Sequence, residues 1–210
     1  MAPIPETFPA QGGRASANYD FIDVANGLGF VRFLGYTTET NGGIAYSFTN
    51  DTSLNSRSIE SSDTTTSVTW TFNSSVFNLP RTMKGTAIMD FQGQLDTNAG
   101  NTGTLFFTVT VSHVSSGGTV TSLGSAITHT ISRGSAGTVF SRFVIPIALT
   151  QKIFKFGDKI RVAVVSTATY GATGIVSIAH DPSGKAGTIF TPVATYPTTF
   201  DAYMPFRIDL

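Results

Sequence analysis

The sequence predicts an all-β fold: an antiparallel two-sheet β-sandwich of the jelly-roll type, preceded by an extended N-terminal arm. Three observations predict it. Apolar and polar residues alternate from residue 19 onward, which is typical of strands that are buried on one face. Gly- and Asn-rich turns separate the alternating runs. No stretch of about ten residues has the 3.6-residue period of a helix.

The first 18 residues form the predicted arm. Its prolines fix φ and remove backbone donors, so this segment is neither a helix nor a central strand. A proline-stiffened segment loses less entropy on docking than a flexible one. We therefore expect one of two states: the arm is disordered, or it contacts a partner subunit through Pro3, Ile4, Pro5, Phe8 and Pro9.

Residues 19–210 are interpreted as a single domain, because no shift in composition divides them. Phe30–Tyr36 is one alternating run, and the alternation is clearest around Trp70, which we place in the core. The Ser/Thr-rich stretch Ser53–Ser67 is predicted to be a loop. Further apolar faces are predicted in segments 44–48, 87–95, 105–111, 127–131, 139–149, 160–164, 176–178 and 204–208.

About ten strands without a helix favour two packed sheets, and the jelly roll is a common way to arrange them. A Greek-key sandwich of immunoglobulin topology is the alternative. The chain contains no cysteine, and so lacks the disulfide that marks antibody-type domains.

The charge balance argues against a phosphate-binding surface. Lys+Arg and Asp+Glu both number 13, and charged residues make up only 12% of the chain. We expect neither nucleic acid nor a membrane as a partner. A neutral, hydroxyl-rich surface suits a protein that packs against neighbours. The N-terminus has no secretion signal, which predicts synthesis in the cytoplasm.

No motif predicts an enzyme, a metal site or a cofactor site. His113, His129 and His180 are far apart in the sequence and form no ligand pair. The segment Asp181–Lys185 lacks the spacing of a phosphate loop and is better explained as a turn. No nucleophile elbow is present.

The types of aromatic residue bear on which kind of partner the chain binds. The chain has 17 Phe but one Trp and six Tyr, and Phe at alternating strand positions indicates a core or a subunit interface. An alternative function is binding of carbohydrate or a receptor by the sandwich. It would use exposed tyrosines, for which Tyr170, Tyr196 and Tyr203 are the candidates.

Three segments carry a resemblance to a known group: 19–33, which follows the Pro-containing arm; the turn and strand Phe154–Val162; and the late turn His180–Gly184. Together they resemble jelly-roll capsid decoration (cement) or minor capsid proteins of tailed bacteriophages and related viruses. The resemblance implies a non-enzymatic virion protein, made in the host cytoplasm, that binds or builds an icosahedral shell. It also implies major capsid subunits as partners, a homotrimeric state, and an arm that reaches neighbouring capsomers. Under the same resemblance, the carbohydrate- or receptor-binding alternative would be a module of a virion fibre or tail.

Overall fold

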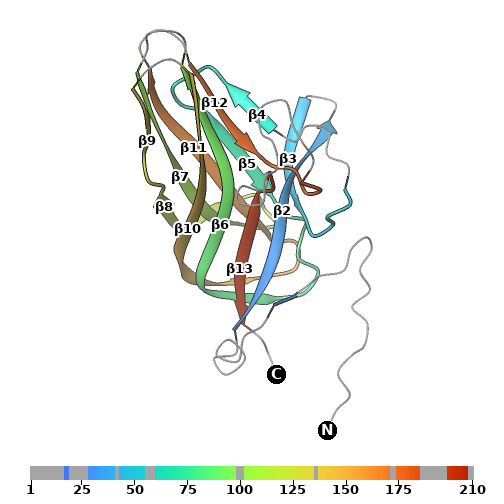
Figure 1. The fold of residues 1–210 in the computed structure, drawn as a ribbon. Helices are drawn as coiled ribbons and strands as arrows, with labels where there is room; N and C mark the ends of the chain where they lie inside the picture. Colours follow the sequence, from blue (N-terminus) through green and yellow to red (C-terminus); the bar gives the residue numbers. More distant parts are fainter. Residues whose placement is uncertain are drawn as a thin grey trace.

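The computed structural model describes residues 17–18, 28–40, 43–54, 60–97, 102–134, 137–170, 174–184 and 198–207. These residues contain strands, turns and loops and no helix, so the prediction of an all-β fold is confirmed (Figure 1). For the same reason, this part of the chain offers no helix that could cross a membrane.

Thirteen strands are present in the described residues. Their bounds are β1 Ala17–Asn18, β2 Leu28–Thr40, β3 Gly43–Thr49, β4 Glu60–Asp63, β5 Thr69–Asn73, β6 Arg81–Thr97, β7 Gly103–Val114, β8 Val120–Ile127, β9 Ile131–Arg133, β10 Gly137–Phe154, β11 Lys159–Tyr170, β12 Gly174–Ala179 and β13 Asp201–Arg207.

Four antiparallel pairs are nested: the outer pairs join early strands to late ones, and the innermost pair joins two consecutive strands. Strand β2 pairs with β13, β5 with β11, β6 with β10, and β7 with β8. Because β13 also pairs with β6, and β11 with β7, these strands form the rows β2-β13-β6-β10 and β5-β11-β7-β8. The pairing is that of a long hairpin rolled up on itself.

The prediction of two separate sheets is wrong, because hydrogen bonding continues from one row into the other. Strand β3 pairs with β2 on one side, and its Ser47 pairs in parallel with Asn73 of β5 on the other. The strands therefore belong to one mixed, mostly antiparallel sheet.

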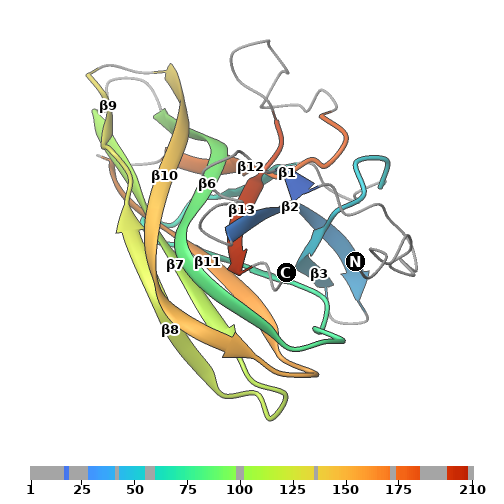
Figure 2. The same ribbon diagram turned by 90° about the horizontal axis from the view of Figure 1, so that it is seen from below.

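The two ends of this sheet also approach each other, since β8 and β10 lie side by side in both views (Figures 1 and 2). Gly124 of β8 permits this approach. A Cβ at Gly124 would lie 2.3 Å from the carbonyl oxygen of Ala148 in β10, which is too close for any other residue. The sheet thus curls almost into a barrel around its core.

Aromatic rings dominate the core, which agrees with the interpretation that Phe at alternating strand positions belongs to a core or a subunit interface. Phe107 makes edge-to-face contacts with Phe91 and Phe143, at centroid distances of 5.4 and 5.2 Å. A Cβ at Gly93 would lie 2.6 Å from the Phe107 ring, so this glycine makes room for the cluster. Trp70 is only 2% exposed, which confirms its predicted place in the core.

Two sequence predictions concern the edges of the sheet. The Ser/Thr-rich stretch Ser53–Ser67 is not entirely a loop, because it contains β4, which pairs with β12. Hydroxyl side chains on both strands form that contact, including a 2.8 Å Oγ–Oγ hydrogen bond between Ser62 and Ser177.

Of the predicted arm, Ala17 and Asn18 form β1 and pair with β2, and residues 1–16 lie outside the described residues.

Candidate functional site

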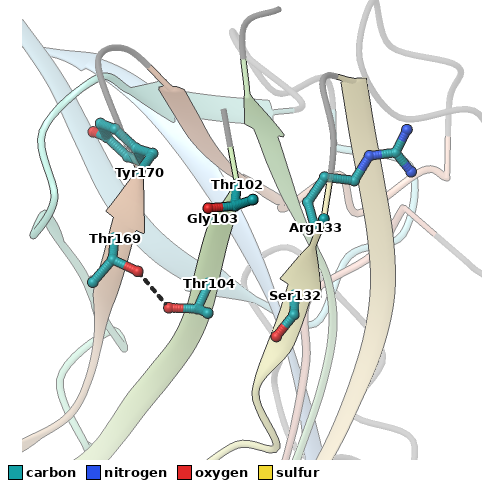
Figure 3. A pocket seen from close by; sticks show the side chains of 8 residues that line it. Thr102, Gly103, Thr104, Ser132, Arg133, Thr169 and Tyr170 are labelled. Atoms are coloured by element: carbon teal, nitrogen blue, oxygen red, sulfur yellow. Dashed lines mark hydrogen bonds between the residues drawn. The ribbon is translucent and has the colours of Figure 1, made fainter. Parts of the chain in front are cut away.

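A hollow of about 410 Å³ lies at one end of the sheet, where β7 begins and β9 and β11 end (Figure 3). We call it the hydroxyl pocket. It is lined by Thr102, Gly103, Thr104, Ser132, Arg133, Gly134, Thr169 and Tyr170.

Strand register explains why hydroxyl groups gather there. Thr104 pairs with Thr169 of β11 on one side and with Ser132 of β9 on the other, so the three side chains form a row across three strands. The Thr104 and Thr169 Oγ1 atoms are hydrogen-bonded at 2.6 Å. The neighbouring residues Leu105 and Ala168 point the other way, into the core. The row therefore presents hydroxyl groups to solvent.

Gly103 fits the floor of the pocket because its surroundings leave no room for a side chain. A Cβ there would lie 2.9 Å from the carbonyl oxygen of Thr169 and 2.9 Å from the methyl group of Thr97. The absence of a side chain on this core-facing side lets β7 lie close to β11 and β6 at the pocket.

Tyr170 and Arg133 flank the hydroxyl row on opposite sides (Figure 3). The Tyr170 hydroxyl donates a hydrogen bond to the Thr64 carbonyl oxygen. Burial, with a smaller contribution from the negative charge of Asp63, raises the pKa of Tyr170, so its hydroxyl stays protonated at neutral pH. The pocket thus presents neutral hydroxyl groups beside one aromatic ring, which are groups that can bind a hydroxylated ligand, whereas the Arg133 guanidinium points away from the row (Figure 3).

The structure separates the tyrosines that the sequence grouped together. Tyr170 lines the hydroxyl pocket, whereas Tyr203 lies on β13, which does not line it. Tyr196 and the arm residues Pro3, Ile4, Pro5, Phe8 and Pro9 lie outside the described residues. Sequence reasoning missed Thr104, Ser132, Arg133 and Thr169, because serine and threonine are too common in this chain for any few of them to stand out.

Tyr203 lies beside a network of ion pairs. Arg32 Nη2 lies 2.9 Å from Asp201 Oδ1, and Arg142 Nε donates to Asp90 Oδ1 at 2.7 Å. The two aspartates pair across β13 and β6, so each carboxylate needs its own arginine. Burial raises the pKa of Asp201, and the positive charge of Arg32 opposes that shift. The burial of Tyr203 likewise raises its pKa.

Each of the three histidines makes a side-chain contact, and two of them are buried. His113 Nε2 lies 2.7 Å from Asp158 Oδ2, and both residues are buried. His180 is fully buried, with its Nε2 atom 2.7 Å from Ser61 Oγ. His129 lies on the surface and contacts Ser141. In the described ranges no group of three or more His, Cys, Asp or Glu side chains is placed to hold a metal ion.

Comparison with known proteins finds no matching family model and no matching curated protein. Among solved structures, the chain is similar to part of an α-amino acid ester hydrolase, with 13% identity and a TM-score of 0.44 over 66% of this chain and 25% of that one. It is also similar to part of a CocE/NonD family hydrolase from Staphylococcus aureus, with 9% identity and a TM-score of 0.45 over 85% of this chain and 36% of that one.

A third similarity is to the infectious bursal disease virus Gx strain structure, with 16% identity and a TM-score of 0.28 over 71% of this chain and 33% of that one. The chain therefore spans between 25% and 36% of the length of these three proteins. All three TM-scores are low, and none of these similarities carries an argument about function.

Proposed function

We propose that this chain is a non-enzymatic structural protein of a virion, which binds and stabilises, or builds, an icosahedral capsid. The nested pairing of strands carries the proposal. The pairs β2–β13, β5–β11, β6–β10 and β7–β8 are those expected of a jelly roll. Jelly rolls recur in viral capsid domains and in lectins. Because one fold hosts many functions, the surface must support the proposal as well.

The outer face of the β6–β10 region supplies that support. Val144 of β10 is 57% exposed, Phe140 is 45% exposed and Ile175 of β12 is 38% exposed. Phe140 pairs with Gln94, and Ile175 with Asp96, so both lie on the same face of β6. Exposed apolar side chains on one face favour contact with another protein, and here the proposed partners are capsid subunits.

The remaining parts of the proposal are the oligomeric state and the arm. A homotrimer with residues 1–16 of the arm lying on neighbouring subunits would repeat each small contact by symmetry. The low proportion of charged residues, 12%, lowers the cost of desolvating such contacts.

Sedimentation with capsid subunits tests the proposal. The wild-type chain should migrate with assembled shells in a density gradient, and Val144→Asp should remain in the soluble fraction. Thr121→Asp, an exposed change on β8, is the matched control and should behave as wild type. Removal of residues 1–13 should leave the fold intact and weaken association. A wild-type chain that never migrates with shells would contradict the proposal.

Binding of a glycan by the hydroxyl pocket is the second candidate function, and the row of Thr104, Thr169 and Ser132 beside Tyr170 favours it. A glycan array should then give hits that Thr169→Val abolishes. Tyr203→Phe, on a strand outside the pocket, should leave those hits unchanged. An array without hits for the folded wild-type chain would remove this candidate.

A further inference from the structure

Cations gather at the end of the molecule opposite the hydroxyl pocket, where β6 begins and β10 ends. Four of the five lysines lie there together with one arginine: Arg81, Lys84, Lys152, Lys155 and Lys159. Figure 2 looks at the molecule from this side. Within the described part of the chain, none of these five side chains forms a salt bridge. We call this region the lysine end.

The same end exposes large apolar side chains. Phe156, in the turn between β10 and β11, is 71% exposed, and Leu79, in the segment before β6, is 59% exposed. These two segments are joined through Phe77, whose N–H donates to the Asp158 carbonyl at 2.8 Å and whose carbonyl accepts from the Gly157 N–H at 2.9 Å. Ile153 and Val76 add further exposed aliphatic surface, at 58% and 44%.

A buried carboxylate holds the turn that carries Phe156. Asp158 accepts hydrogen bonds from the backbone N–H groups of Lys155 and Ser116, at 2.8 and 3.0 Å, as well as from His113. Gly157 has a φ of 84°, which is favourable for glycine and lets the chain reverse directly after Phe156. The turn is therefore fixed before any partner binds, which lowers the entropy cost of docking.

We propose that the lysine end docks on a bilayer of anionic phospholipid. Phe156 and Leu79 would enter the boundary between headgroups and acyl chains, and the surrounding lysines would contact the lipid phosphates. The exposed apolar side chains match the apolar part of such a bilayer, and the lysines, which form no salt bridge within the described residues, match its negative charge. Single-stranded nucleic acid is a poorer match, because bases stack on aromatic rings, and only Phe156 among the four exposed apolar side chains is aromatic. The proposal does not rest on the proposed capsid function.

Co-sedimentation with vesicles tests the proposal. The full chain is mixed with vesicles of phosphatidylcholine alone, or of phosphatidylcholine with phosphatidylglycerol, at low and at high salt. We expect binding only to the anionic vesicles and a marked loss at high salt, because salt screens the lysines. Equal binding to both vesicle types, or none to either, would overturn the proposal.

Paired variants identify the surface. Lys155→Gln with Lys159→Gln should weaken binding about fivefold per lost charge, and Phe156→Ser about tenfold. Ser125→Glu with Thr130→Glu changes the net charge equally on exposed positions away from the lysine end, and Ile127→Ser removes a comparably exposed apolar side chain from β8. Both controls should bind as wild type, with folding checked by circular dichroism.

Two outcomes of the variant series would count against the proposal. If the charge control weakens binding as much as the lysine pair does, then net charge and not the lysine end is responsible. If a fluorescent single-stranded oligonucleotide binds tightly and loses binding with Phe156→Ser, while vesicles do not bind, then the surface recognises nucleic acid instead.

Discussion

The two ends of the molecule differ although the same strands, β7 and β11, reach both. One end presents the row of Thr104, Thr169 and Ser132. The other presents the exposed ring of Phe156 and cations that form no salt bridge among the described residues. A formal net charge of zero therefore describes neither end. A whole-chain charge can exclude a binding class only when the charges are evenly spread, and here they are not.

The ends also differ in what holds them together. At the lysine end, one carboxylate, Asp158, joins the β7–β8 turn to the β10–β11 turn. At the pocket end, close backbone packing at Gly103 and the hydrogen bond from Tyr170 to Thr64 hold the strands. Changes at the two ends should therefore have different consequences.

Asp158→Asn is expected to have the largest effect. The buried His113 would lose its charged partner, and an amide cannot replace all three hydrogen bonds that the carboxylate accepts. Breaking a buried pair in this way should lower the free energy of unfolding by about 3 kcal/mol. Urea denaturation measures this change. A loss near zero would mean that the two turns are held by other contacts.

Gly103→Ala should have the next largest effect and lower the free energy of unfolding by about 2 kcal/mol, because the added methyl group would collide with the Thr169 carbonyl on β11. Urea denaturation measures it, and Gly134→Ala is the control, since a Cβ at Gly134 meets nothing within 4 Å. Equal stability of the two variants would show that the strands can separate freely at the pocket.

Tyr170→Phe should cost about 1 kcal/mol, since it removes the donor to Thr64 and keeps the ring. Thermal unfolding measures the change. The substitution should also leave the vesicle binding proposed for the lysine end unaltered, and a loss of that binding would show that the two ends are coupled.

Acid is the mildest perturbation, because it titrates a carboxylate without removing it. The His113 side chain, together with backbone donors, holds the pKa of Asp158 below its ordinary value of 3.8. A lowered folded-state pKa stabilises the fold above the unfolded value and loses that contribution as the pH falls through the folded one. Wild-type stability should therefore fall below about pH 4, with a smaller fall in Asp158→Asn. Urea denaturation at several pH values measures the two proteins. An equal loss of stability at acid pH in the wild type and in Asp158→Asn would contradict this prediction.

The fold was largely predictable because period-two alternation directly reflects burial on one face. Trp70, Phe91, Phe107 and Phe143 were placed correctly on that basis, whereas Phe140 and Phe156 are exposed. The merging of two rows into one sheet was not predictable, since it depends on a single parallel contact between Ser47 and Asn73, which no local pattern encodes.

The candidate surfaces were harder to predict than the core. Tyr170 could be singled out as an aromatic residue, but the hydroxyl row beside it depends on strand register, which links Thr104 to a partner 65 residues away. The lysine end likewise assembles from residues 81–84 and 152–159, which are far apart in the sequence. Contacts of this kind follow from topology and not from local sequence.

Immunogold electron microscopy of purified virus particles tests the capsid function most directly. Antibody raised against the folded chain should label intact particles at regularly spaced positions, and the protein should remain with the particles through a density gradient. Label confined to soluble fractions of the infected culture, with none on intact particles, would contradict the account.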